Sequence, residues 1–224
     1  MKQQTHYILV NGIHTLPSDK QAWTDRMAVW LSYLCGNCKS AFRLEYFTPF
    51  LMATRSLINR RQRRKLVEQI LSYPSDAVVV LVGHSNGCDI ICDALGQLLN
   101  DEKELLTGVP EIRLVLIAGA VEHNFEKNYI NSAMHVDLVS QCTVLASKND
   151  KVLKWAARPS RWIFFRLGYG YLGYQAAIDV NSLKILFPKQ VEVIIDDDQD
   201  HTSWLAGDKC FDETARVVCL SGRR

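Results

Sequence analysis

The sequence predicts an α/β fold with a mostly parallel sheet of about six strands and helices on both faces. Short apolar runs rich in β-branched residues alternate with longer segments of helical periodicity, which is typical of repeated βαβ units. The apolar runs are continuous rather than interrupted by polar residues, as in strands that are covered on both faces. Hydrophobic residues make up 48% and charged residues 22% of the 224 residues, so we expect a packed core.

Each element follows from its local pattern. Continuous apolar runs predict strands at residues 7–10, 41–47, 77–82, 112–119, 142–147 and 191–195. Helical periodicity predicts helices at about 19–34, 51–72, 87–100, 123–139 and 203–219. Ser18 is a suitable N-cap for the first helix. No repeat, low-complexity tract or linker divides the chain, and we therefore expect a single domain over residues 1–224.

Charge, apolar runs and cysteines limit the partners and the location. The formal net charge of +2 is too small to indicate, by itself, a nucleic acid or a membrane surface as a partner, so only local clusters of charge are informative. The longest apolar runs, residues 77–82 and 114–120, are far shorter than the roughly 18 residues of a membrane span, and the first residues do not resemble a secretory signal. Seven cysteines, an odd number, favour reduced thiols, with Cys35 and Cys38 unconnected. We expect a cytoplasmic protein without stable membrane insertion.

The strongest motif is Gly83-His84-Ser85-Asn86-Gly87, which follows an apolar run and precedes a segment compatible with a helix. A serine on a sharp strand-to-helix turn projects its hydroxyl beside the helix N-terminus and nearby backbone N–H groups. The flanking glycines lack Cβ atoms, so strand and helix can approach closely at the bend. The alternative is a glycine-rich turn whose serine only caps the helix. The run resembles the nucleophile elbow of the α/β-hydrolase superfamily, and the resemblance extends from about Tyr7 to Trp204.

A serine nucleophile needs a general base, and the base needs an acid that holds its tautomer and orientation. In the superfamily the chain order is serine, acid, histidine. Asp150, just after the strand at 142–147, resembles the acid, and His201, after the strand at 191–195, resembles the histidine. We expect His84 to support the turn rather than to reach the hydroxyl. The alternatives left open are His14, His123 and His135 as the base, and Glu122, Asp197, Asp198 and Asp200 as the acid.

The tetrahedral intermediate of acyl transfer requires N–H donors aimed at its oxyanion. The resemblance implies two donors, the backbone N–H of Asn86 and that of Ile13, although Asn11 stands where many family members have a histidine. No cofactor is implied, and no metal is expected. The acidic run at 196–200 lacks the turn glycine and the terminal glutamate of a calcium loop.

An aromatic-rich insertion at about 153–176 precedes the last strand, where a lid would cover the serine. Its glycines predict repeated bends rather than one long helix. Residues that could line an apolar substrate pocket are His14, Trp155, Trp162, Phe165 and Tyr171. The other interpretation, that half of the aromatic residues pack into the core, stays open.

A dense basic stretch lies on the predicted helix before the elbow strand. It consists of Arg55, Arg60, Arg61, Arg63, Arg64 and Lys65. A solvated helix face is the simplest interpretation, because apolar residues supply the other side of the helix. Binding of phospholipid headgroups or of another anion is the alternative.

The resemblance implies a serine hydrolase with a catalytic triad that cleaves a carboxylic ester through an acyl-enzyme at Ser85. Such an esterase-like or lipase-like enzyme would act on a small-molecule acyl ester, lipid esters included. A thioesterase or acyltransferase using the same triad is the enzymatic alternative. An inert member that binds a lipid or a protein is the alternative of another class. Nothing in the sequence indicates the oligomeric state.

Overall fold

The computed structural model describes residues 4–12, 22–36, 38–44, 52–101, 108–121, 128–156, 172–179 and 189–223, with only the backbone of 34, 52–56, 101, 155 and 156. The elements of the first half are β1 (Thr5–Val10), α1 (Trp23–Leu34), β2 (Cys38–Leu44), α2 (Met52–Leu71), β3 (Val78–His84) and α3 (Asn86–Asp101). Those of the second half are β4 (Glu111–Ile117), α4 (Ile130–His135), β5 (Val139–Ala146), α5 (Lys151–Ala156), α7 (Leu172–Ile178), β6 (Val191–Ile195), η3 (Ser203–Leu205) and α9 (Asp208–Ser221).

The six predicted strands are confirmed and form one parallel sheet in the order β2-β1-β3-β4-β5-β6. The chain runs from β1 outward to β2, returns to place β3 on the other side of β1, and then adds each later strand in sequence order. The strand order therefore reverses between β1 and β3, where Val10 lies beside Gly83. In open α/β sheets, binding sites lie at the carboxyl ends of the strands at such a reversal.

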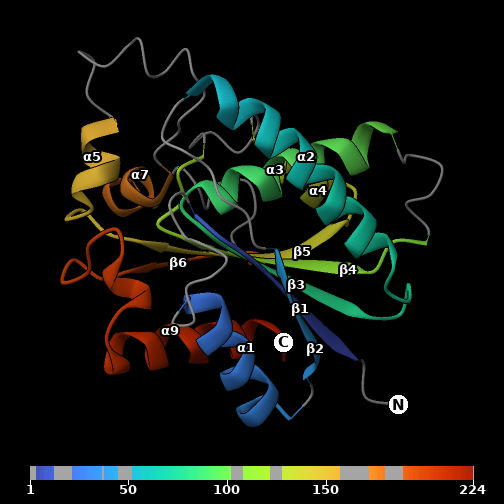
Figure 1. The fold of residues 1–224 in the computed structure, drawn as a ribbon, viewed down its shortest axis with the longest axis horizontal. Helices are drawn as coiled ribbons and strands as arrows, with labels where there is room; N and C mark the ends of the chain where they lie inside the picture. The colour runs from blue at the N-terminus through green and yellow to red at the C-terminus, as the bar shows by residue number, and fades with distance from the viewer. Residues whose placement is uncertain are drawn as a thin grey trace.

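Two helical layers cover the sheet (Figure 1). The layer of α2, α3 and α4 lies on one face, and α1 and α9 lie on the other. Successive residues of β1 point to opposite faces, so Ile8 and Val10 pack in the first layer while Tyr7 and Leu9 pack in the second. This two-sided burial explains why inner strands such as β1 and β3 are apolar runs, whereas the edge strand β2 is partly exposed and carries polar residues. The fold class predicted from the sequence is confirmed.

Three predicted helices differ from the structure at their ends. The helix α1 begins at Trp23 after Ala22, and Ser18 lies outside the described residues. The predicted helix at 123–139 was too long, because Asp137 adopts a left-handed backbone with φ of 56° and β5 begins at Val139. The predicted helix at 203–219 is divided, because Gly207, with φ of 64°, separates the single turn η3 from α9.

The predicted insertion at 153–176 is described only near its two ends. The short helices α5 and α7 lie there, and Leu172 and Ala176 are fully buried. Trp162, Phe165 and Tyr171 lie outside the described residues, as does the side chain of Trp155. The lid therefore stays a prediction, while the C-terminal end of the insertion packs into the core.

A disulfide joins Cys35, directly after α1, to Cys219 in α9, with the two Cα atoms 6.0 Å apart. The expectation of reduced thiols throughout was wrong for this pair. The two cysteines are 184 residues apart in the sequence, so the sequence pattern could not indicate that they meet. Cys35 and Cys38 are unconnected to each other, as expected. None of the helices within the described ranges is both long and apolar enough to cross a membrane.

Candidate active site

Ser85 occupies the bend between β3 and α3 with a left-handed backbone, at φ of 52°. Its N–H donates to the carbonyl of Ile117 at 3.0 Å, and its own carbonyl accepts from the N–H groups of Cys88 and Ala120, both at 3.1 Å. A non-glycine residue in this backbone region is strained and persists only where its surroundings hold it. Hydrogen bonds to β4, to the loop after it and to α3 hold Ser85 in this way.

Three glycines allow backbones to meet around Ser85. A Cβ on Gly83 would lie 2.9 Å from the backbone N of Cys88, and one on Gly87 would lie 2.6 Å from the carbonyl oxygen of Asn11. A Cβ on Gly12 would lie 3.1 Å from the Cβ of Ser85. The loop after β1 therefore passes directly against the serine and the first turn of α3. Ile13 and His14, the next two residues of this loop, lie outside the described residues.

Ser85, His201 and Asp150 are joined by a continuous chain of hydrogen bonds. The Oγ of Ser85 lies 2.9 Å from Nε2 of His201, and Nδ1 of His201 lies 2.8 Å from Oδ2 of Asp150. An ionised carboxylate only accepts, so Nδ1 carries the proton and Nε2 is left to accept from the serine hydroxyl. This arrangement makes His201 able to remove a proton from Ser85.

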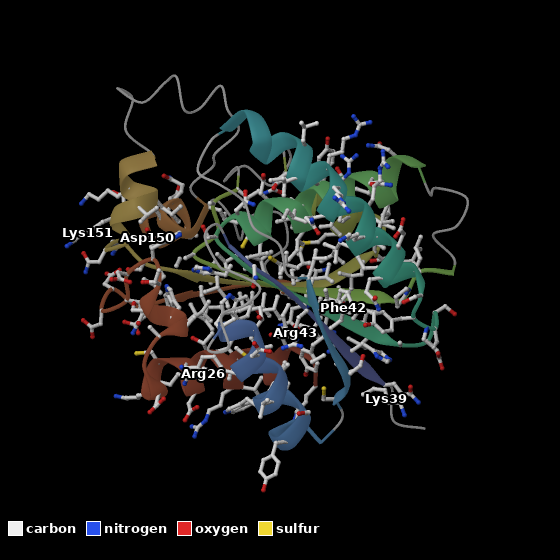
Figure 2. All side chains as sticks on the ribbon, in the orientation of Figure 1. Arg26, Lys39, Phe42, Arg43, Asp150 and Lys151 are labelled. Carbon is white, nitrogen blue, oxygen red and sulfur yellow. A yellow bond between two sulfur atoms is a disulfide. The ribbon has the colours of Figure 1, made fainter. Side chains whose placement is uncertain are left out.

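Asp150 is almost fully buried, with 1% of its surface exposed. Its second oxygen, Oδ1, accepts from the N–H of Leu153 at 2.8 Å and so caps the first turn of α5. Figure 2 shows Asp150 and Lys151 at the α5 end of the molecule, far from Lys39 of β2. Because both carboxylate oxygens have fixed partners, the group can neither rotate nor leave His201 without losing a hydrogen bond.

The loop that carries Asp150 and the loop that carries His201 are bonded to each other. They follow β5 and β6, which are neighbours in the sheet. The hydroxyl of Ser147 donates to the carbonyl of Gln199 at 2.6 Å, and the N–H of Lys148 donates to Asp197 at 3.0 Å. These bonds hold the two loops at the distance that the Asp150–His201 pair requires.

The alternative bases and acids lie elsewhere or outside the described residues. Asp197 contacts Lys148, and the carboxylate of Asp200 accepts from the N–H groups of Thr202 and Ser203, which lowers the pKa of Asp200. His135 is exposed at the end of α4. Residues outside the described ranges are His14, Glu122 and His123. In the part of the chain that is described, no group of three or more potential ligand side chains is arranged to hold a metal ion.

His84 lies behind the site, with 8% of its surface exposed, and supports the loop of His201. Its Nε2 lies 2.9 Å from the carbonyl oxygen of His201, so Nε2 carries the proton and donates. Its Nδ1 would lie 3.0 Å from a Cβ on Gly12. Burial, and then the proximity of His201, lowers the pKa of His84 to about 4, so the ring is neutral at pH 7. The neutral ring thus touches both the loop after β1 and the loop after β6.

Asn59 of α2 is a site residue that sequence reasoning missed. It is buried and exchanges two side-chain hydrogen bonds with Asn86, at 3.1 and 3.3 Å, and donates a third to Asp89 at 3.0 Å. The sequence did contain an indication of a role for Asn59, because Asn59 and Gln62 are polar residues on the otherwise apolar side of α2. The pair ties α2 to the residue that follows Ser85.

The comparisons with known proteins agree with this fold. A family model described as an alpha/beta hydrolase of unknown function (DUF900) matches residues 54–169. A candidate hydrolase from Agrobacterium vitis S4 is 14% identical with a TM-score of 0.58, covering 97% of this chain and 88% of that one. A candidate hydrolase of the alpha/beta superfamily from Xanthomonas campestris pv. campestris is 16% identical with a TM-score of 0.54, covering 96% of both chains.

A third similar structure is that of a serine hydrolase involved in carbazole degradation, at 14% identity and a TM-score of 0.52, covering 98% of this chain and 92% of that one. No curated protein sequence matches. At these identities the similar structures establish the fold alone. The family model spans the Ser85 elbow and Asp150 and covers more than half of the chain. The chain therefore belongs to the α/β-hydrolase family of unknown function that this model defines.

Proposed function

We propose that the protein is a serine hydrolase that cleaves a carboxylic ester through an acyl-enzyme at Ser85. The observation that carries the proposal is the chain of hydrogen bonds from Ser85 through His201 to buried Asp150. A serine that only capped α3 would need neither an imidazole at 2.9 Å nor a carboxylate behind that imidazole.

In the proposed reaction, Nε2 of His201 takes the hydroxyl proton of Ser85 while Oγ attacks the ester carbonyl carbon. The carbonyl oxygen becomes an oxyanion, which we assign to the backbone N–H groups of Asn86 and Ile13. The tetrahedral intermediate collapses as His201 returns the proton to the departing alcohol, which leaves an acyl group on Ser85. Water then attacks the acyl carbon, its proton passes to His201 and on to Ser85, and the carboxylic acid is released. Asp150 stabilises the imidazolium that forms twice in this cycle.

Membership of a hydrolase family supports the reaction class, and the rigid elbow supports the nucleophile. The serine hydrolase with a similar fold supports the same assignment by analogy. The ester substrate rests on the resemblance of the sequence to the esterase-like and lipase-like members of the superfamily. A thioesterase or acyltransferase would use the same three residues, and an inert binding protein would use none of them.

The first experiment is labelling with a fluorophosphonate probe, read as intact mass, because it tests the nucleophile without knowledge of the substrate. We expect one probe per chain on the unmodified protein and none on Ser85→Ala. The matched control is Ser72→Ala, which removes an exposed serine at the end of α2 and should label fully. Labelling of Ser85→Ala would refute Ser85 as the nucleophile, and failure to label the folded unmodified protein would leave the binding role.

A labelled protein is then tested on matched pairs of p-nitrophenyl esters and acyl-coenzyme A thioesters of equal chain length. Faster turnover of the oxygen esters is the expected result, and preference for the thioesters would reassign the enzyme to the thioesterase class. Acyl transfer to an added alcohol rather than to water would identify an acyltransferase.

The single domain and the cytoplasmic location stay predictions. Limited proteolysis tests the first, and cell fractionation tests the second. The Cys35–Cys219 disulfide counts against the cytoplasm, because disulfides persist mainly in oxidising compartments.

A further inference from the structure

The outer face of α2 carries a row of exposed cations. Arg60, Arg61, Arg64 and Lys65 are exposed, and their spacing of one, four and five residues places them along one side of the helix. Within the described part of the chain none of them forms an ion pair. Elsewhere arginines do find carboxylates, as Arg26 does with Asp208 and Arg113 does with Glu111.

Among the residues that the structure describes, the packing contacts of α2 lie on the side opposite this row. Leu66, Val67 and Ile70 pack the opposite side of α2 into the core, and Asn59 bonds it to α3. Like charges four residues apart, as in Arg60 with Arg64, destabilise a helix. The only carboxylate in α2 is Glu68, against six cations. A row that costs helix stability and has no ion-pair partner among the described residues is explained by an anionic partner.

An exposed leucine on the same side of α2 selects the kind of partner. Leu57 is 70% exposed and lies one turn before Arg60 and Arg61. A nucleic acid would complement the cations but would leave this leucine in water. A bilayer rich in acidic lipids supplies anionic headgroups for the cations and an apolar layer for the leucine.

We propose that the outer face of α2, formed by Leu57, Arg60, Arg61, Arg64 and Lys65, is a docking surface for acidic membranes. The helix lies at the outside of its layer (Figure 1), so a flat surface can reach it. Through Asn59 the same helix contacts Asn86, the neighbour of Ser85. Docking would therefore bring the helix that adjoins the candidate active site to the lipid surface. The proposal does not depend on hydrolysis.

The test uses the full chain with Ser85→Ala, so that lipids are not consumed, and measures sedimentation with vesicles. One set is phosphatidylcholine alone, and the other contains about 30% phosphatidylglycerol. We expect binding to the acidic vesicles only, falling steeply between about 50 and about 300 mM salt. Equal binding to both sets, or none, would overturn the proposal.

The decisive variant carries Arg60→Glu, Arg61→Glu, Arg64→Glu and Lys65→Glu. At roughly fivefold for each cation near an acidic surface, we expect at least about a 100-fold loss of acidic-vesicle binding. The matched control carries Lys39→Glu, Lys189→Glu, Lys209→Glu and Arg216→Glu, at four exposed positions outside α2. It changes the net charge equally and should lose less than about fivefold. An equal loss in the control would mean that net charge, not the α2 face, drives binding.

Two milder variants keep the test valid if a quadruple variant fails to fold. Arg60→Gln with Arg64→Gln should weaken acidic-vesicle binding by about 25-fold. Leu57→Ala should weaken it by about tenfold and leave binding to a duplex DNA unchanged. Vesicle binding that does not respond to Leu57→Ala, with duplex DNA binding at least as tightly, would assign the face to nucleic acid and overturn the proposal.

Discussion

His84 makes the folded protein sensitive to acid in a way that can be measured without any substrate. Burial first, and then the nearby His201, lowers its pKa from 6.5 to about 4. In the unfolded chain the ring regains its ordinary pKa, so the unfolded state binds more protons between about pH 6.5 and about pH 4. The free energy of unfolding therefore falls as the pH falls through that window.

The magnitude follows from the pKa difference. A shift from 6.5 to about 4 corresponds to a loss of about 3 kcal/mol once the pH is well below 4. Between about pH 7.5 and about pH 5 the same linkage gives a loss of about 2 kcal/mol. His84→Gln removes the titration but keeps an N–H donor for the carbonyl of His201, because the glutamine amide reaches as far as Nε2.

Urea unfolding, followed by tryptophan fluorescence at about pH 7.5 and about pH 5, measures this difference. We expect the unmodified protein to lose about 2 kcal/mol more than His84→Gln between the two conditions. His135→Gln is the control, since His135 is exposed, and should behave as the unmodified protein does. His6, whose pKa burial also lowers, contributes equally to all three proteins. The reasoning fails if His84→Gln loses as much stability as the unmodified protein does.

Three further variants test the site. Asp150→Asn should lower ester turnover by about 10³–10⁴-fold, because the amide favours the wrong tautomer of His201. Its thermal unfolding should stay nearly unchanged, because the asparagine side chain can still accept from the N–H of Leu153 and cap α5. Asn59→Ala should lower the free energy of urea unfolding by about 1–3 kcal/mol, because it leaves buried polar partners unsatisfied. Gly87→Ala should lower it by about 1–3 kcal/mol, because the new Cβ would meet the backbone of the loop after β1.

Each of these has its own control or contrary result. Asp150→Asn that keeps more than about a tenth of the turnover would contradict the assigned acid. For Asn59→Ala the matched variant is Gln69→Ala, on an exposed bond of the same helix, which should change stability by less than about 0.5 kcal/mol. For Gly87→Ala the matched control is Gly108→Ala, because a Cβ on Gly108 would meet nothing within 4 Å. Equal losses of unfolding free energy in the two variants would count against the packing argument.

Local pattern was enough to predict the sheet and the position of the elbow. Strands buried on both faces must be continuous apolar runs, and a serine between glycines after such a run can only lie at the carboxyl end of the sheet. Helix ends were less predictable, because the left-handed residues Asp137 and Gly207 end or divide helices where the apolar periodicity continues. Chain order also pointed to Asp150 and His201, but left several other histidines and carboxylates open.

What the tertiary structure decided is which of these side chains meet. In the sequence, Ser85 and His201 are 116 residues apart, and Asp150 and His201 are 51 residues apart. A local sequence pattern contains no information on contacts over such separations. The same holds for the Asn59–Asn86 pair and for the Cys35–Cys219 disulfide. By itself the sequence determined the fold class and the position of the Ser85 bend, because both depend on periodicity and local backbone sterics. The hydrogen-bond partners of Ser85 depend on loops that meet only after the strands β3, β5 and β6 are aligned in one sheet.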